Sequence, residues 1–114
     1  MACGDRKSKM DKVIRAGKVA VLYSPGYGAG WYSWNRDFPQ CLFDPEIVAM
    51  VEGGKREAIS DFADHKYGGT FFSSGGDQLR ISWVAEGARF EIEEYDGNEN
   101  VHVFTDDEGL VLVA

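Results

Sequence analysis

Long hydrophobic runs and secretory features are missing from this sequence of 114 residues. Its apolar runs, such as residues 19–23 and 110–114, reach only about five residues, whereas a membrane-spanning helix needs ~20. The first fifteen residues carry basic side chains but no apolar segment of the kind that a secretory signal contains. These absences predict a protein that does not cross a membrane and that has a cytoplasmic location.

Cysteine and histidine are equally scarce. Cysteine occurs only at Cys3 and Cys41, and histidine only at His65 and His102. The sequence has no Cys-x-x-Cys pair and no zinc-finger spacing, so we expect free thiols and no metal site. Neither histidine has a Ser or Cys nucleophile beside it in a known motif. The sequence therefore predicts a protein with no cofactor and no enzymatic activity.

Positive charge is nearly absent from the last quarter of the chain. From residue 86 onward there is one cation, Arg89, against nine carboxylates: Glu86, Glu91, Glu93, Glu94, Asp96, Glu99, Asp106, Asp107 and Glu108. This region accounts for the net charge of −7, because the preceding residues nearly balance. A surface this negative repels phosphate backbones, which disfavours direct nucleic-acid binding and favours a basic protein partner.

Length and composition indicate one domain. Apolar residues make up 44% and charged residues 27% of the chain, which is typical of globular proteins. A chain of this length can bury one core and is too short for two. Residues Met1–Asp11 are polar and lack periodicity, so we expect a loose leader followed by a single domain over residues 12–114.

The hydrophobic pattern changes from helical to strand-like along the chain. Asp44-Pro45-Glu46 begins a helix that ends at Gly53-Gly54, and residues 55–66 form a second amphipathic helix closed by Gly68-Gly69. Turns are expected at residues 74–77 and 95–98. Strands are predicted at residues 18–23, 70–73, 79–83, 89–93, 101–104 and 110–113. This order predicts an α+β fold, with a twisted antiparallel β-sheet of five to six strands and two short helices packed on one face.

A glycine-rich segment at residues 26–35, here called the aromatic loop, holds four large rings: Tyr27, Trp31, Tyr32 and Trp34. Its glycines permit a positive φ, and their G-x-G-x-G spacing without a following Gly-Lys-Ser/Thr excludes a nucleotide P-loop. In one interpretation the loop is a tight turn whose rings fill the edge of the core. In the other, the rings and Asn35 form an exposed platform that stacks a base or anchors a partner.

The last predicted strands provide a second candidate surface. Glu91 and Glu93 are expected to share a solvated face opposite Phe90 and Ile92, and Tyr95 and Asp96 follow at the next turn. An acidic strand face of this kind either contacts a basic partner or is simply hydrated.

Arg80 and Arg89 also lie on predicted strands, among acidic residues. Pairing with glutamates of a neighbouring strand is one interpretation of these arginines, and such pairs are weak at a hydrated surface. Contact with an anion inside a ligand cleft is the other interpretation. The sequence leaves both open.

Three segments resemble a family of small proteins carried by tailed bacteriophages and prophages. They are residues 19–35 with the motif S-P-G-x-G-A-G-W-x-x-W, residues 42–48, and residues 90–97 with the motif E-Y-D-G. The resemblance covers residues 12–101 and leaves out both ends of the chain. It implies an anti-defence protein, similar in role to an anti-CRISPR, that inhibits a bacterial immune effector by stoichiometric binding in the host cytoplasm.

The resemblance is compatible with two kinds of partner. The acidic face could occupy the basic nucleic-acid groove of a host defence protein, or the aromatic loop could line a pocket that sequesters a nucleotide-derived immune signal. A phage structural or assembly accessory protein, which would form homo-oligomers, is a third interpretation.

Overall fold

The structure, a computed structural model, describes residues 12–26, 30–95, 98–104 and 112–114. Within these residues the chain forms the α+β fold that the sequence predicts. The elements in chain order are β1 (Ile14–Arg15), β2 (Lys18–Tyr23), α1 (Pro45–Glu52), α2 (Ile59–Tyr67), β3 (Arg80–Ala85), β4 (Arg89–Tyr95), β5 (Asn98–Val103) and β6 (Leu112–Val113). Short 3-10 helices are η2 (Tyr32–Trp34), η3 (Pro39–Leu42), η4 (Arg56–Ala58) and η5 (Ser74–Gln78). No helix in the described ranges has the length and apolar character needed to span a membrane.

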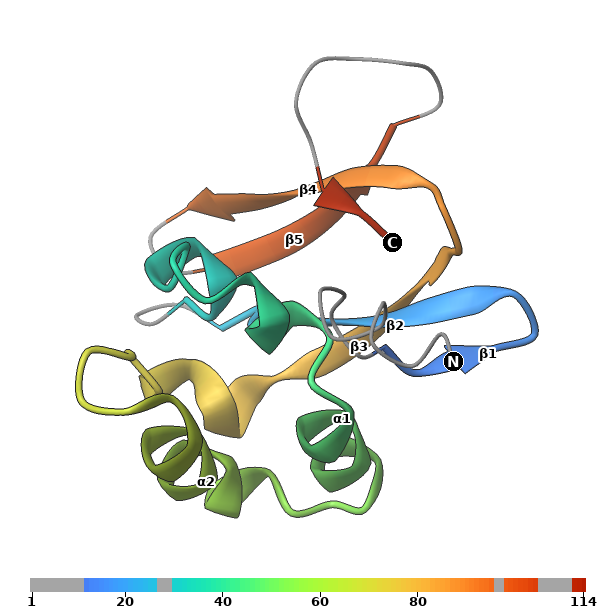
Figure 1. Ribbon diagram of the computed structural model, residues 1–114. Coiled ribbons are helices and arrows are strands. Elements are labelled where there is room, and N and C mark those ends of the chain that lie inside the picture. The colour runs from blue at the N-terminus through green and yellow to red at the C-terminus, as the bar shows by residue number, and fades with distance from the viewer. Residues whose placement is uncertain (1–11, 27–29, 96–97, 105–111) are drawn as a thin grey trace, which may run out of the picture.

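The strands lie in two antiparallel sheets, where the sequence predicted one. The first sheet has the order β1-β2-β3 and the second β5-β4-β6. In Figure 1 the second sheet lies on one side of β2 and β3, and α1 and α2 lie on the other. The division follows from β2, because Ala20 and Leu22 pack toward the helices while Val19 and Val21 pack toward the second sheet. A strand buried on both faces reads as a continuous apolar run, as β2 does.

The sequence correctly singles out both ends of α1 and the C-terminal end of α2, whereas the second helix, predicted from residue 55, begins only at Ile59, after η4. The carboxylate of Asp44 accepts hydrogen bonds from the main-chain nitrogens of Glu46 and Ile47, at 3.0 and 3.3 Å, and so caps α1. Gly54 and Gly68 follow α1 and α2 with φ of +75° and +92°, a region that glycine adopts without strain. These residues therefore fix both ends of α1 and the C-terminal end of α2, the two helices that cover the first sheet.

The strand predicted at residues 70–73 is wrong, because the main chain of Phe72 bonds with the side chain of Asn35 and not with another strand. Residues 74–77, expected as a turn, lie in η5. Strand β1 was not predicted, because two residues carry no recognisable alternation. The predicted leader, part of the turn at residues 95–98 and the first half of the last predicted strand fall outside the described residues.

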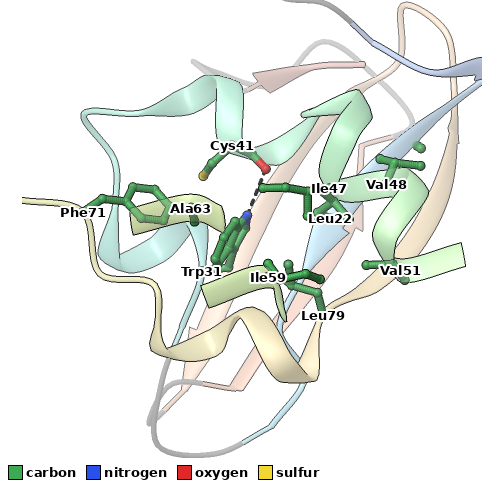
Figure 2. Packing of buried hydrophobic residues seen from close by; sticks show 11 residues of the cluster. Leu22, Trp31, Cys41, Ile47, Val48, Val51, Ile59, Ala63, Phe71 and Leu79 are labelled. Atoms are coloured by element: carbon green, nitrogen blue, oxygen red, sulfur yellow. Dashed lines mark hydrogen bonds between the residues drawn. The ribbon is translucent and has the colours of Figure 1, made fainter. Parts of the chain in front are cut away.

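Trp31 lies at the centre of the core between the helices and the first sheet (Figure 2). Its side chain is 0% exposed, and its indole nitrogen donates a hydrogen bond of 2.9 Å to the main-chain oxygen of Cys41. The indole also meets the ring of Phe71 edge to face, with 5.1 Å between centroids. The aromatic loop is therefore anchored in the core by one of its own rings.

Candidate functional site

The expected platform of exposed rings in the aromatic loop is only partly present. Trp31 is a core residue, so the expectation that it contacts a partner at the surface is wrong. Tyr32 is half-buried, and the guanidinium of Arg36 lies 5.3 Å from the centre of its ring. Trp34 is 40% exposed, while Tyr27 lies outside the described residues. The loop thus divides its rings between the core and the surface.

Trp34 has an exposed aromatic neighbour that the sequence did not reveal. Phe72, from the segment between α2 and η5, is 58% exposed and meets Trp34 edge to face, with ring centroids 6.3 Å apart and an interplanar angle of 90°. This is the favoured geometry for two aromatic rings. We call Trp34 and Phe72 the aromatic pair. Two distant segments of the chain therefore present one apolar feature at the surface.

Asn35 holds the two segments of the aromatic pair together. Its side-chain nitrogen donates hydrogen bonds to the main-chain oxygens of Trp31 and Phe72, at 2.7 and 2.9 Å. Its side-chain oxygen accepts a bond of 2.7 Å from the main-chain nitrogen of Phe72. Asn35 is only 3% exposed, so it supports the candidate site from the protein interior and is poorly placed to contact a partner itself.

A buried carboxylate completes this support. Glu99, at the start of β5, is fully buried, and its Oε2 accepts hydrogen bonds from Trp31 N (2.7 Å), Ser33 N (2.8 Å) and Ser33 Oγ (2.6 Å). Its Oε1 accepts a bond of 2.9 Å from Ser24 N, while Glu99 N donates to Ser24 O at 2.7 Å. We call Glu99 and Asn35, with the groups they bind, the buried polar frame. It joins the end of β2, the aromatic loop and the second sheet.

The glycine of the loop nearest the frame is explained by close packing. A Cβ on Gly30 would lie 2.3 Å from Ser33 Oγ, 2.9 Å from Trp34 Cδ1 and 3.1 Å from Glu99 Oε2. The expected reason, a positive φ, is wrong for Gly26, which has none. Gly30 is therefore required because the frame and the indole leave no room for a side chain.

The acidic face of β4 has the alternation that the sequence predicts. As predicted, Phe90 and Ile92 are buried, while Glu91 is half-buried and Glu93 exposed on the opposite face of β4. Tyr95, at the end of β4, is 77% exposed. Of the other carboxylates counted above, Glu99 is buried in the frame, and four lie outside the described residues: Asp96, Asp106, Asp107 and Glu108.

Three side chains near Asp44 have a displaced pKa: Tyr67 and Lys66, where α2 meets the start of α1, and Cys41, which is buried in η3. Burial and a hydrogen bond of 2.6 Å to Asp44 raise the pKa of Tyr67 well above its ordinary value. Burial acts to lower the pKa of Lys66, but its bonds to Asp44 and Glu46 outweigh this and raise it. Burial also raises the pKa of Cys41. These shifts arise from packing and helix capping.

Arg15, on β1, is paired with a carboxylate on α1. Arg15 forms a paired contact of 2.6 and 2.8 Å with Glu52, which raises the pKa of the arginine. In the described part of the chain, no group of three His, Cys, Asp or Glu side chains is arranged to hold a metal ion.

Comparison of this chain with protein-family models, with curated proteins and with solved structures gives no match. The assignment of a site therefore depends on geometry. Of the predicted residues the structure brings together Trp31, Trp34 and Asn35, with the ring of Trp31 in the core, and it adds Phe72 and Glu99. The sequence did not point to Phe72, because its segment was wrongly predicted to be a strand. Nor did it point to Glu99, which is one of nine carboxylates after residue 85 and was counted as a surface charge.

Proposed function

We propose that this protein is a non-enzymatic binding module that recognises a protein partner through the aromatic pair. The observation that carries the proposal is the exposure of Trp34 and Phe72, side by side, above the buried polar frame. Large aromatic side chains dominate the binding energy of many interfaces. Rings that are already held in position lose less conformational entropy on binding than mobile ones.

The charge of the chain favours a basic partner surface. The net charge is −7, and the exposed carboxylate of Glu93 lies on β4, the strand that η2 and its Trp34 adjoin. Charge complementarity of this kind accelerates association and excludes acidic competitors, and its effect declines with salt. A basic groove that normally binds nucleic acid has the required sign of charge.

The resemblance to proteins of tailed phages suggests what that partner is. We propose a bacterial defence effector in the cytoplasm of the host cell, inhibited by a stoichiometric complex with this chain. The apolar pair would provide most of the affinity, and the acidic residues would orient the chain on the basic groove.

The test measures two things: whether the protein protects a phage from host defence, and whether it forms a complex with an effector. The full chain is expressed in host strains that each carry one defence system, and plaques are counted after infection. The wild type should restore plaques in at least one host and co-purify with an effector protein at a fixed ratio. Trp34→Ala with Phe72→Ala should weaken that complex by about thirtyfold or more, as expected for the loss of an interface hot spot of about 2 kcal/mol.

Trp83→Ala is the matched control, since Trp83 is a comparably exposed tryptophan on β3, where it contacts Arg15 and lies outside the pair. This variant should keep both protection and binding. Circular dichroism must show that each variant is folded. Equal affinity of the double variant and the wild type would contradict the role of the pair, and protection in no host would contradict the defence role.

A further inference from the structure

A cavity of about 550 Å³ opens where β2 ends and β3 begins. Its walls come from Tyr23 and the following Pro25 and Gly26, from Arg56 of η4, and from the end of η5 with Arg80. In Figure 1 η5 is the gold coil that leads directly into β3. Ligand pockets in proteins commonly measure ~300–1,000 Å³, so this cavity can hold a molecule of nucleotide size.

Backbone pairing places an aromatic ring and a guanidinium side by side in this cavity. Tyr23 and Arg80 are direct partners in the register of β2 and β3, and side chains at such positions are neighbours on one face of the sheet. The cross-strand partner of Arg80 is thus a tyrosine, so pairing with a glutamate directly opposite, one of the two interpretations above, does not occur.

A second guanidinium is fixed next to the first. Arg56 Nε donates a hydrogen bond of 2.8 Å to the main-chain oxygen of Leu79, the residue before Arg80. This bond positions the half-buried Arg56 side chain and leaves its terminal nitrogens to other partners. The cavity therefore has two arginines, one of them held by the main chain.

Neither arginine is neutralised within the part of the chain that the structure describes. Arg15 and Lys66 form ion pairs there, whereas Arg56 and Arg80 form none. Asp77 also lines the cavity, so the charged groups that the described residues contribute to it are two guanidinium groups and one carboxylate. An excess of positive charge in a concave site favours a bound anion. The negative net charge of the protein does not cancel this effect, because charges more than ~8 Å away are screened at physiological salt.

We propose that this cavity binds a small organic phosphate of nucleotide size. The guanidinium groups of Arg56 and Arg80 hold the phosphate, for which their fork of donors is well suited. The ring of Tyr23 packs against the planar part of the ligand, and Asp77 accepts a hydrogen bond from a hydroxyl or amino group. The site shares no residue with the aromatic pair, so it adds a second binding function to the proposed one.

The test uses adenosine 5′-monophosphate as the probe, titrated into the full chain labelled with ¹⁵N. The main-chain amides of Tyr23 and Gln78 and the Nε–H groups of both arginines should shift together and saturate. Inorganic phosphate should shift the arginine signals more weakly, and adenosine without phosphate should bind far less tightly than the nucleotide. Citrate distinguishes a phosphate site from a general anion site, because a general site would take citrate equally well.

The variant Arg80→Gln should weaken nucleotide binding by about tenfold or more, since it removes a charged hydrogen-bond donor. Lys55→Gln is the matched control: it removes one positive charge from an exposed residue adjacent to Arg56 but outside the cavity lining, and it should bind as the wild type does. The proposal is overturned if millimolar nucleotide and millimolar phosphate leave the cavity signals unmoved. It is also overturned if citrate binds as tightly as the nucleotide, or if Arg80→Gln and Lys55→Gln weaken binding equally.

Discussion

Replacing Glu99 with glutamine tests the buried polar frame, because this change keeps the shape of the side chain and converts one acceptor into a donor. The carboxylate accepts four hydrogen bonds from Ser24, Trp31 and Ser33. In either orientation the new amide group faces at least one N–H donor and leaves it unpaired. A buried donor without a partner costs about 1–3 kcal/mol.

The other hydrogen bonds also weaken, because bonds to a charged group contribute about 1.5–3 kcal/mol and neutral ones about 0.5–1.5 kcal/mol. An opposing term is the cost of burying the carboxylate, which glutamine avoids and which amounts to several kcal/mol for an isolated ion. We expect a net loss of about 2–4 kcal/mol in the free energy of unfolding. For a domain of this size that corresponds to a decrease in Tm of roughly 8–16 °C.

Urea denaturation followed by circular dichroism measures this loss, provided that the m-values agree. Glu93→Gln is the control, since it makes the same chemical change at an exposed position of β4, and it should stay within about 0.5 kcal/mol of the wild type. Amide hydrogen exchange at Trp31 and Ser33 should accelerate in Glu99→Gln alone. A loss for Glu99→Gln no larger than that of the control would refute the reasoning that the carboxylate holds the loop.

Two further predictions concern packing and pH. Gly30→Ala should cost about 1–3 kcal/mol in urea denaturation, because its Cβ would meet Ser33 Oγ and the ring of Trp34; an unchanged midpoint would show that the loop has spare room. Burial and Asp44 raise the pKa of Tyr67 above its ordinary 10.0, so above that pH the unfolded chain releases the proton first and the wild type loses stability. The stability advantage of the wild type over Tyr67→Phe should therefore be constant below that pH and shrink above it, and an advantage that grows instead would contradict the sign of the shift.

Local signals were sufficient to predict most of the secondary structure. Strand β2, the cap at Asp44, the amphipathic pattern of α2 and the alternation of β4 each depend on residues close together in sequence, and the structure confirms them. The division into two sheets was not predicted, because alternation shows which face of a strand is buried and says little about which strands pair. That choice depends on β2 being covered on both faces.

The candidate site was harder to predict because it is assembled from distant segments. Trp34 could be singled out from the density of rings in its loop. Phe72 could not, since the run of residues 70–73 has the composition of a strand. Its main-chain groups are bonded elsewhere: Asn35 binds those of Phe72, and the neighbouring residues bond with Gly68 and Gly76. Nor could Glu99, because nothing in the sequence distinguishes its buried carboxylate from those of the acidic residues near it.

The frame also determines what kind of binding the aromatic pair can support. Asn35 and Glu99 hold the segments of Trp34 and Phe72 in place. The entropic cost of ordering these segments is therefore met on folding, before a partner binds. Ordering a rotamer-rich side chain at an interface costs about 0.5–1.5 kcal/mol, which a preorganised pair largely avoids. Substitutions in the frame should therefore lower stability and affinity together, whereas substitutions in the pair should lower affinity with little loss of stability. This separation distinguishes a preorganised site from rings that are exposed merely because the core has no room for them.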